Sequence, residues 1–183
     1  MASVIRSNMR TILPEIRSRL LSWPTTALHF GEYRAFLVAQ SKTVPIQADK
    51  VLLIRPLDFT VQRGWADGAG RMATRIDRRI SLTVRTRLNI DMDGGADVEW
   101  LTNLDYGHLA LEEAIPDALE EYFPRNASGD HLTLEPIRML SGSVPTVGHE
   151  VQRGQETQDY GESTLIYTAA YLLDVNQYTN PNQ

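Results

Sequence analysis

The densest run of potential metal ligands in the sequence is NIDMDGGADVEW, residues 89–100, in which acidic side chains recur at alternate positions. A helix–loop–helix calcium site needs oxygen ligands at the first, third and fifth loop positions, a glycine at the sixth and a bidentate glutamate at the twelfth. Counted from Asp91, those last three positions hold Gly95, Ala96 and Thr102. We therefore interpret the stretch as a solvated turn built on its Asp-Gly dipeptide, and not as a metal site.

A second group that could do chemistry is Asp105, His108 and Glu112, whose spacings of three and four place them on one face of a helix. Such a triad could bind a metal ion. On an acidic amphipathic helix the same pattern is typical of a solvated face, and we adopt that interpretation. The glycines after residue 63 lack dinucleotide or P-loop spacing, and the SGS run at 141–143 lacks the nucleophile-elbow pattern. We predict no catalytic, cofactor or metal site, and no enzyme.

Composition narrows the class of protein further. The chain has 183 residues, 42% of them hydrophobic, which suits one globular domain spanning residues 1–183. It has no cysteine, so disulfides and cysteine-ligated metals are excluded. No stretch has the apolar length of a signal peptide or membrane span, so we expect a soluble intracellular product. The net charge of −5 argues against a protein whose main task is to hold nucleic-acid phosphates.

The charges are segregated along the chain. A basic block is followed by an acidic one. The basic block comprises Arg71, Arg75, Arg78, Arg79, Arg85 and Arg87; the acidic block includes Asp91, Asp93, Asp97, Glu99, Asp105, Glu112, Glu113, Asp117, Glu120 and Glu121. Two solvated faces would produce this pattern, and so would a basic face of one copy that meets an acidic face of the next.

The first half of the chain shows weak periodicity apart from its beginning. Residues 4–22 carry apolar side chains at helical spacing, with Pro14 marking a kink or a late start. A short strand is predicted at 35–38, and a buried strand at 51–56 is closed by Pro56. The run FTVQRGW places Phe59, Val61, Arg63 and Trp65 on one face, but glycines follow, so we predict a mobile insertion over residues 63–78.

The second half contains the stronger elements. Alternation from residue 79 to 90 predicts a long half-buried strand with Ser81, Thr83 and the arginines on its outer face. A helix is predicted over 104–122, with a bend or a division into two abutting helices near Ile115. A strand over 131–140 is interrupted by Pro136, which favours an edge position or a bulge. A long loop or loose hairpin at 141–162 precedes a last strand at 164–175 and a disordered tail at 176–183. The order favours an α+β fold, a mixed or antiparallel sheet with helices on one face and long loops.

The sequence resembles the tail terminator, or tail completion, proteins of long-tailed bacteriophages, the group of the lambda minor tail terminator. The likeness rests on the element order and on two strands, the arginine-bearing RRISLTVRTRLNID and the final STLIYTAAYLLDV, with a helix ending in ALEEYF between them. It covers residues 4–175. The stretch 23–50 and the loop at 141–162 are longer than in compact members of that group.

The resemblance implies a subunit without catalysis or cofactor that closes into a six-membered ring on the last ring of tail tube protein. Such a ring stops tube polymerisation, presents a surface to the head-side connector or stopper protein, and lets genomic DNA pass through its lumen without specific binding. It would be assembled in the host cytoplasm and would reside in the neck of the virion. A different neck protein, such as a stopper or adaptor, and a small α+β ligand-binding module are the competing interpretations.

Within that picture the charge blocks and the insertion supply the candidate interface residues. We expect the exposed arginines of the long strand to meet glutamates of a neighbouring subunit, and the insertion to contact a neighbouring ring. Reversing Arg85 and Arg87 to glutamate is then expected to weaken assembly and leave the subunit folded. The candidates are Arg79, Arg85, Arg87, Glu112, Glu113, Glu120, Trp65, Arg71 and Arg75.

Overall fold

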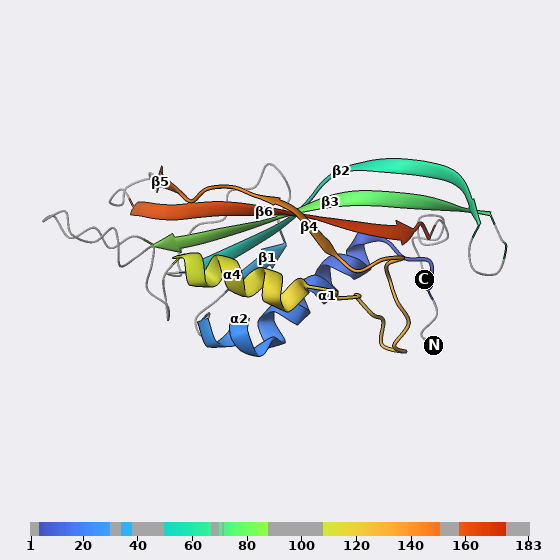
Figure 1. Cartoon of the computed structure of the whole chain (residues 1–183), viewed down its shortest axis with the longest axis horizontal. Helices are drawn as coiled ribbons and strands as arrows, with labels where there is room; N and C mark the ends of the chain where they lie inside the picture. The colour runs from blue at the N-terminus through green and yellow to red at the C-terminus, as the bar shows by residue number, and fades with distance from the viewer. Residues whose placement is uncertain are drawn as a thin grey trace, which may run out of the picture.

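The computed structural model describes residues 4–29, 34–37, 50–66, 70, 72–87, 108–150 and 158–174. In these residues the chain forms an α+β fold in which three helices lie on one side of a six-stranded sheet (Figure 1). The predicted fold class is confirmed. The elements are α1 (Met9–Ser22), α2 (Pro24–His29), β1 (Arg34–Leu37), β2 (Lys50–Ala66), β3 (Met72–Arg87), α4 (His108–Leu119), β4 (Arg138–Gly142), β5 (Thr146–Glu150) and β6 (Gln158–Leu172).

The sheet is mixed, with one parallel pair at its edge. The strand order is β1-β2-β3-β6-β4, and β5 also pairs with β6. β1 runs parallel to β2, whereas the pairs β2–β3, β3–β6 and β6–β4 are antiparallel. β3 and β6 pair in unbroken register from Arg75↔Leu172 to Arg87↔Tyr160, and they form the centre of the sheet.

α1 begins later than the sequence predicted. Asn8 caps it by accepting hydrogen bonds from the backbone N–H groups of Arg10 and Thr11 at 2.9 and 3.3 Å. Residues 4–8 therefore precede the helix, which continues through Pro14 to Ser22. In the same way α4 is one helix that includes Pro116, and not two helices divided by it. Among the described helices, none combines the length and apolarity needed to cross a membrane.

The core lies between the helices and one face of the sheet. β3 contributes Ile80, Leu82 and Val84, each fully buried, at the alternate positions that the sequence indicated. The main helical and strand partners in this cluster are Ile12, Ile16, Leu20, Leu52, Ile54, Leu111, Ile115, Leu119, Leu165, Tyr167, Ala169 and Tyr171. The sequence predicts Ser81 and Thr83 on the outer face of β3. They do lie on the face opposite Ile80 and Leu82, but they are only 5% and 8% exposed.

The prediction that β2 stops at Pro56 is wrong. β2 continues for 17 residues, from Lys50 to Ala66, and it pairs with β3 as far as Ala66↔Met72. Proline is tolerated in a strand at an edge or beside a bulge, and both conditions hold: β1 pairs with β2 only up to Ile54, and a bulge follows Pro56.

The mobile insertion predicted at 63–78 is correspondingly wrong for most of its length. Residues 63–66 belong to β2 and residues 72–78 to β3, and together they form an arm that extends past the helices (Figure 1). We call residues 57–66 and 72–78 the arm. Arg71 lies outside the described residues, as do the acidic turn at 89–100 and the tail at 176–183.

Of the long loop or loose hairpin predicted at 141–162, the hairpin is confirmed, because β5 pairs antiparallel with the start of β6 from Thr146↔Glu162 to Glu150↔Gln158. β4 occupies the start of this stretch, β5 its middle and β6 begins at Gln158. β4 itself begins only at Arg138, two residues after Pro136, so the predicted strand at 131–140 is shifted toward its carboxyl end.

Candidate functional site

The arm carries a stripe of large apolar side chains that the fold leaves in solvent. Phe59, Val61 and Met72 are 50%, 48% and 71% exposed. In the register Phe59 faces Arg78, Val61 faces Ile76 and Met72 faces Ala66, so all three project from the side of the sheet that the helices cover elsewhere. We call these three residues the arm stripe. Large apolar side chains left exposed on one face are typical of a contact surface.

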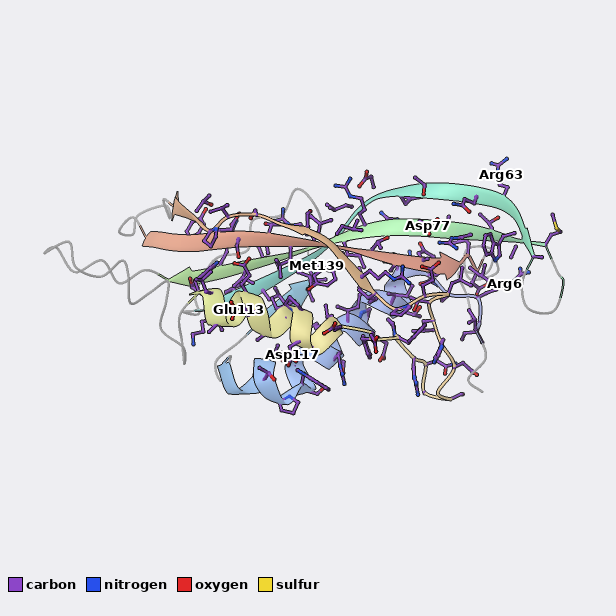
Figure 2. All side chains as sticks on the ribbon, in the orientation of Figure 1. Arg6, Arg63, Asp77, Glu113, Asp117 and Met139 are labelled. Atoms are coloured by element: carbon purple, nitrogen blue, oxygen red, sulfur yellow. The ribbon has the colours of Figure 1, made fainter. Side chains whose placement is uncertain are left out.

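Trp65 lies on the other side of the arm, contrary to the single face predicted for Phe59, Val61 and Trp65. A bulge between Gln62 and Trp65 adds a residue and so inverts the alternation. Gly64 makes this bulge possible because its φ of +78° lies in a region that residues with a Cβ rarely adopt. Figure 2 shows Arg63 pointing outward from the arm, far along the molecule from Glu113 on α4.

Arginines brace the arm. The Arg78 guanidinium lies 4.8 Å from the centre of the Phe59 ring, and that of Arg75 lies 4.9 Å from the Trp65 ring. Arg75 also binds Asp77 at 2.7 Å and Glu135 at 3.2 Å. The hydrogen bond from Arg75 to Asp77 is the main reason that the pKa of Arg75 is raised, against the opposing effect of burial. These contacts hold Arg75 within its own subunit and hold the arm as a strand pair.

A second exposed apolar surface lies at the opposite edge of the sheet. All five residues of β4 are exposed, and Met139 and Leu140 are 50% and 55% exposed. Val144, just after the strand, is 80% exposed. The edge position or bulge that Pro136 predicts for this strand is confirmed on both counts, since β4 ends the strand order and has a bulge between Met139 and Ser141.

The charged candidates are dispersed and several of them have partners within the chain. Arg79 binds Asp58 at 3.4 Å with its side chain 51% exposed, whereas Arg85 binds Glu162 with its side chain only 15% exposed. Arg85 is thus not the solvent-facing arginine that was predicted. Glu113 on α4 and Glu120, just after its last residue, are exposed, as an intersubunit role requires. For Arg87 the structure describes the backbone at the end of β3 and not the side chain.

A buried polar cluster surrounds His108, which the sequence placed in a possible metal triad. His108 is fully buried, and its two ring nitrogens lie 2.9 Å from the hydroxyls of Thr86 and Ser163. Burial lowers the pKa of His108 to about 4, so the ring is neutral at pH 7. Burial likewise raises the pKa of Glu112, one turn along α4, although a hydrogen bond with Ser163 opposes that shift.

This His108 cluster is structural in character. Ser163 is 1% exposed, so a substrate cannot reach its hydroxyl in this conformation, and the ring nitrogen opposite it meets a threonine and not a carboxylate. Asp105 lies outside the described residues. In the part of the chain that the structure describes, no three His, Asp or Glu side chains are placed to hold a metal ion.

A shallow basic hollow lies where the N-terminal segment and the start of α1 meet residues 125–132. It encloses about 470 Å³ and is lined by Arg6, Arg10 and Arg125 together with Glu15 and Leu132. The Arg6 guanidinium reaches across to the backbone oxygen of Met72 at 3.3 Å, which ties the hollow to the base of the arm.

Comparison with known proteins does not assign the chain to a group. No protein-family model matches it, and no curated protein does. The arm, the β4 edge, the His108 cluster and the basic hollow must be interpreted from their own geometry.

Calcium and a chelator are both expected to leave the midpoint of thermal unfolding unchanged, because the acidic turn lacks the glycine and the bidentate glutamate of a calcium loop. Thermal melts with added calcium and with a chelator test this. A shift of several degrees, which corresponds to about 1 kcal/mol for a domain of this size, would show instead that the turn binds the ion.

Proposed function

We propose that this chain is a structural subunit that assembles with copies of itself into a ring, and that the ring is the tail terminator of a long-tailed bacteriophage. The observation that carries the proposal is a sheet with two different open edges, β4 with its exposed Met139 and Leu140 on one side and β2 beyond Ile54 on the other. Two different surfaces on one subunit favour a head-to-tail contact, and a head-to-tail contact closes into a ring when its rotation allows.

The place of the ring in a phage tail rests on the resemblance of the sequence. The ring would sit on the last ring of tail tube protein, halt its polymerisation and receive the head-side connector. A net charge of −5 suits a lumen through which DNA must pass without being held. The arm stripe is our candidate contact with the neighbouring ring of tube protein, since the arm extends beyond the helices (Figure 1).

The decisive experiment is the native mass of the concentrated protein combined with negative-stain imaging. Closed rings with an open centre are expected. A protein that stays monomeric at every concentration reached would overturn the proposal. Rings that bind a head-side portal or connector protein, and not tube protein, would reassign the chain to a stopper or adaptor role in the same neck.

Replacing Phe59 and Val61 together with serine is expected to weaken binding of the ring to tail tube protein by about tenfold or more, because apolar side chains at the centre of a contact dominate its affinity. Pull-down with tube protein measures the loss. The chain should still fold, since both side chains are about half exposed and the lost Arg78–Phe59 contact contributes only about 0.5–1 kcal/mol. Leu21→Ser on α1, where the side chain is 37% exposed, is the matched control and should bind like the unaltered chain.

The basic hollow supports a second candidate, a small module that binds an anionic ligand. Guanidinium groups are well suited to carboxylates and phosphates, and the hollow combines three arginines with apolar side chains. Calorimetric titration with inorganic phosphate and with a dicarboxylate distinguishes the two candidates. Saturable binding by a protein that forms no rings would favour the module.

A further inference from the structure

One row of side chains crosses the sheet from edge to edge and ends in opposite charges. Arg138 of β4 pairs with Thr168 of β6, and Thr168 pairs with Arg79 of β3. Arg79 in turn binds Asp58 of β2 at 3.4 Å. Cross-strand partners project from the same face, so the row presents a cation at the β4 edge and an anion at the β2 edge. Both terminal side chains are well exposed, 64% for Arg138 and 71% for Asp58.

The backbone at these two edges is also open for pairing. In the described part of the chain, β4 pairs only with β6, and β2 beyond Ile54 pairs only with β3. β4 therefore presents N–H and C=O groups on its outer side, which is a template for another strand, and β2 does the same except at Pro56, which has a C=O and no N–H. The registers of the three strand pairs place Arg138–Ser141 of β4 at the same height along the sheet as residues 55–58 of β2. This part of β2 begins where β1 ends.

The strand directions suit a contact between two copies in the same orientation. β2, β3, β6 and β4 alternate in direction, so β4 runs opposite to β2. A second copy brought alongside by rotation about an axis near the strand direction presents its β2 antiparallel to β4 of the first. The alternation of the sheet then continues across the boundary, in the more stable of the two pairing modes.

We propose that the ring is built by this sheet continuation: β4 of one subunit pairs antiparallel with residues 55–58 of the next, with Arg138 beside Asp58. This inference rests on the proposed ring and names the contact that closes it. Charge selects the register, because a slip of about three residues toward β1 sets Arg138 against Arg55, and like charges opposite each other destabilise a sheet. β1 blocks any larger slip in that direction, since it already occupies the β2 edge up to Ile54.

The absence of cysteine from the sequence makes the register directly measurable. The variant with Asp58→Cys and Arg138→Cys is assembled, treated with a mild oxidant and run on a denaturing gel without reductant. Opposed residues in antiparallel strands lie about 4.5–5.5 Å apart between Cα atoms, within the range that a disulfide spans. Within one subunit β3 and β6 separate the two positions by about 14 Å, so a bond can form only between copies.

A ladder of covalent multimers that ends at the full ring is the expected result. The two single-cysteine variants should yield no species above a dimer. Gln62→Cys with Arg138→Cys is the matched control: residue 62 lies on the same edge about 13 Å further along, so its ladder should be less than about one-tenth as abundant.

The outcomes separate this inference from the proposed function. Rings that form normally but do not cross-link through 58 and 138, or that cross-link equally through 62 and 138, would overturn the sheet continuation and leave the ring intact. Cross-linking that stops at dimers would indicate a two-fold contact and overturn the head-to-tail arrangement. A chain that remains monomeric in every variant would remove both proposals.

Discussion

Lowering the pH from 7 to 4 is expected to cost the folded chain about 3 kcal/mol of stability through His108. The pKa of this side chain is 6.5 in its ordinary state and about 4 in the folded chain, and each pH unit between the two values corresponds to about 1.4 kcal/mol. Because the folded pKa is depressed, the unfolded chain binds the proton first. The contribution of neutral His108 to the free energy of unfolding is therefore fully present above pH 6.5 and is lost as the pH falls toward 4.

The cause of this sensitivity lies in the arrangement of the His108 cluster. Both ring nitrogens face hydroxyls, of Thr86 and of Ser163, and the ring is fully buried against the sheet. A neutral ring satisfies this environment, whereas an added proton places a charge where water cannot solvate it. The ionisable neighbour on α4 is Glu112, whose raised pKa acts in the opposite direction: its protonation stabilises the fold as the pH falls through the folded value.

Urea unfolding at a series of pH values, with two variants, separates these contributions. His108→Gln should flatten the dependence between pH 6.5 and 4, with a loss of about 1–3 kcal/mol at pH 7 from the hydrogen bonds it cannot reproduce. Glu112→Gln should make the acid-side decline steeper, because it removes the opposing titration. If His108→Gln keeps the slope of the unaltered chain, His108 is not the titrating group.

The elements that the sequence predicts correctly are those whose own residue pattern determines their conformation. The alternation around Ile80, Leu82 and Val84 is intrinsic to the strand, and it predicted both the strand and its buried face. It could not show that Ser81 and Thr83 are buried on the other face, because burial there depends on what the rest of the chain brings over the sheet. Serine and threonine are small and polar, so their presence on that face is compatible with either burial or exposure.

The elements that were missed are those whose continuation depends on a partner strand. Pro56 normally ends a strand, yet β2 passes through it because the affected edge is bare and a bulge follows. The glycines near residue 64 predicted a loop, but Gly64 instead provides the positive φ of a bulge that turns Trp65 to the other face. Pairing with β3, which no local pattern reveals, decides both cases.

Some of the contact residues can likewise be named from the sequence, whereas others are revealed only by the fold. Trp65 and Arg75 were named from the glycine-rich stretch and do lie on the arm, but Phe59, Val61 and Met72 form its exposed stripe. Their exposure follows from the length of the β2–β3 pair relative to the helices, which is a property of the whole fold. Asp58 and Arg138 are 80 positions apart in the sequence, and only the register across four strands relates them.

Reversal of Arg85 to glutamate is expected to destabilise the subunit by about 3 kcal/mol, contrary to the sequence-based expectation that this change spares the fold. Arg85 and Glu162 are direct cross-strand partners, with side chains 15% and 30% exposed, and the Arg85 guanidinium also lies 4.9 Å from the centre of the Tyr160 ring. The reversal leaves two carboxylates face to face in a partly buried site. Breaking a buried pair costs about 3–5 kcal/mol, and the partial exposure of Glu162 places this case at the lower end.

The charge swap and a matched exposed pair make this prediction specific. Arg85→Glu combined with Glu162→Arg restores opposite charges across the same register and should recover most of the lost stability in urea unfolding, a coupling that independent surface charges would not show. Arg79→Glu beside Asp58 is the control, because those side chains are 51% and 71% exposed and such a pair contributes about 1 kcal/mol or less. Equal losses for Arg79→Glu and Arg85→Glu, or no recovery in the swapped chain, would contradict the assignment of Arg85 to the interior of its own subunit. An assembly defect in Arg85→Glu must accordingly be compared with its loss of stability, whereas Arg79, Glu113 and Glu120 can report on the ring alone because their side chains lie in solvent.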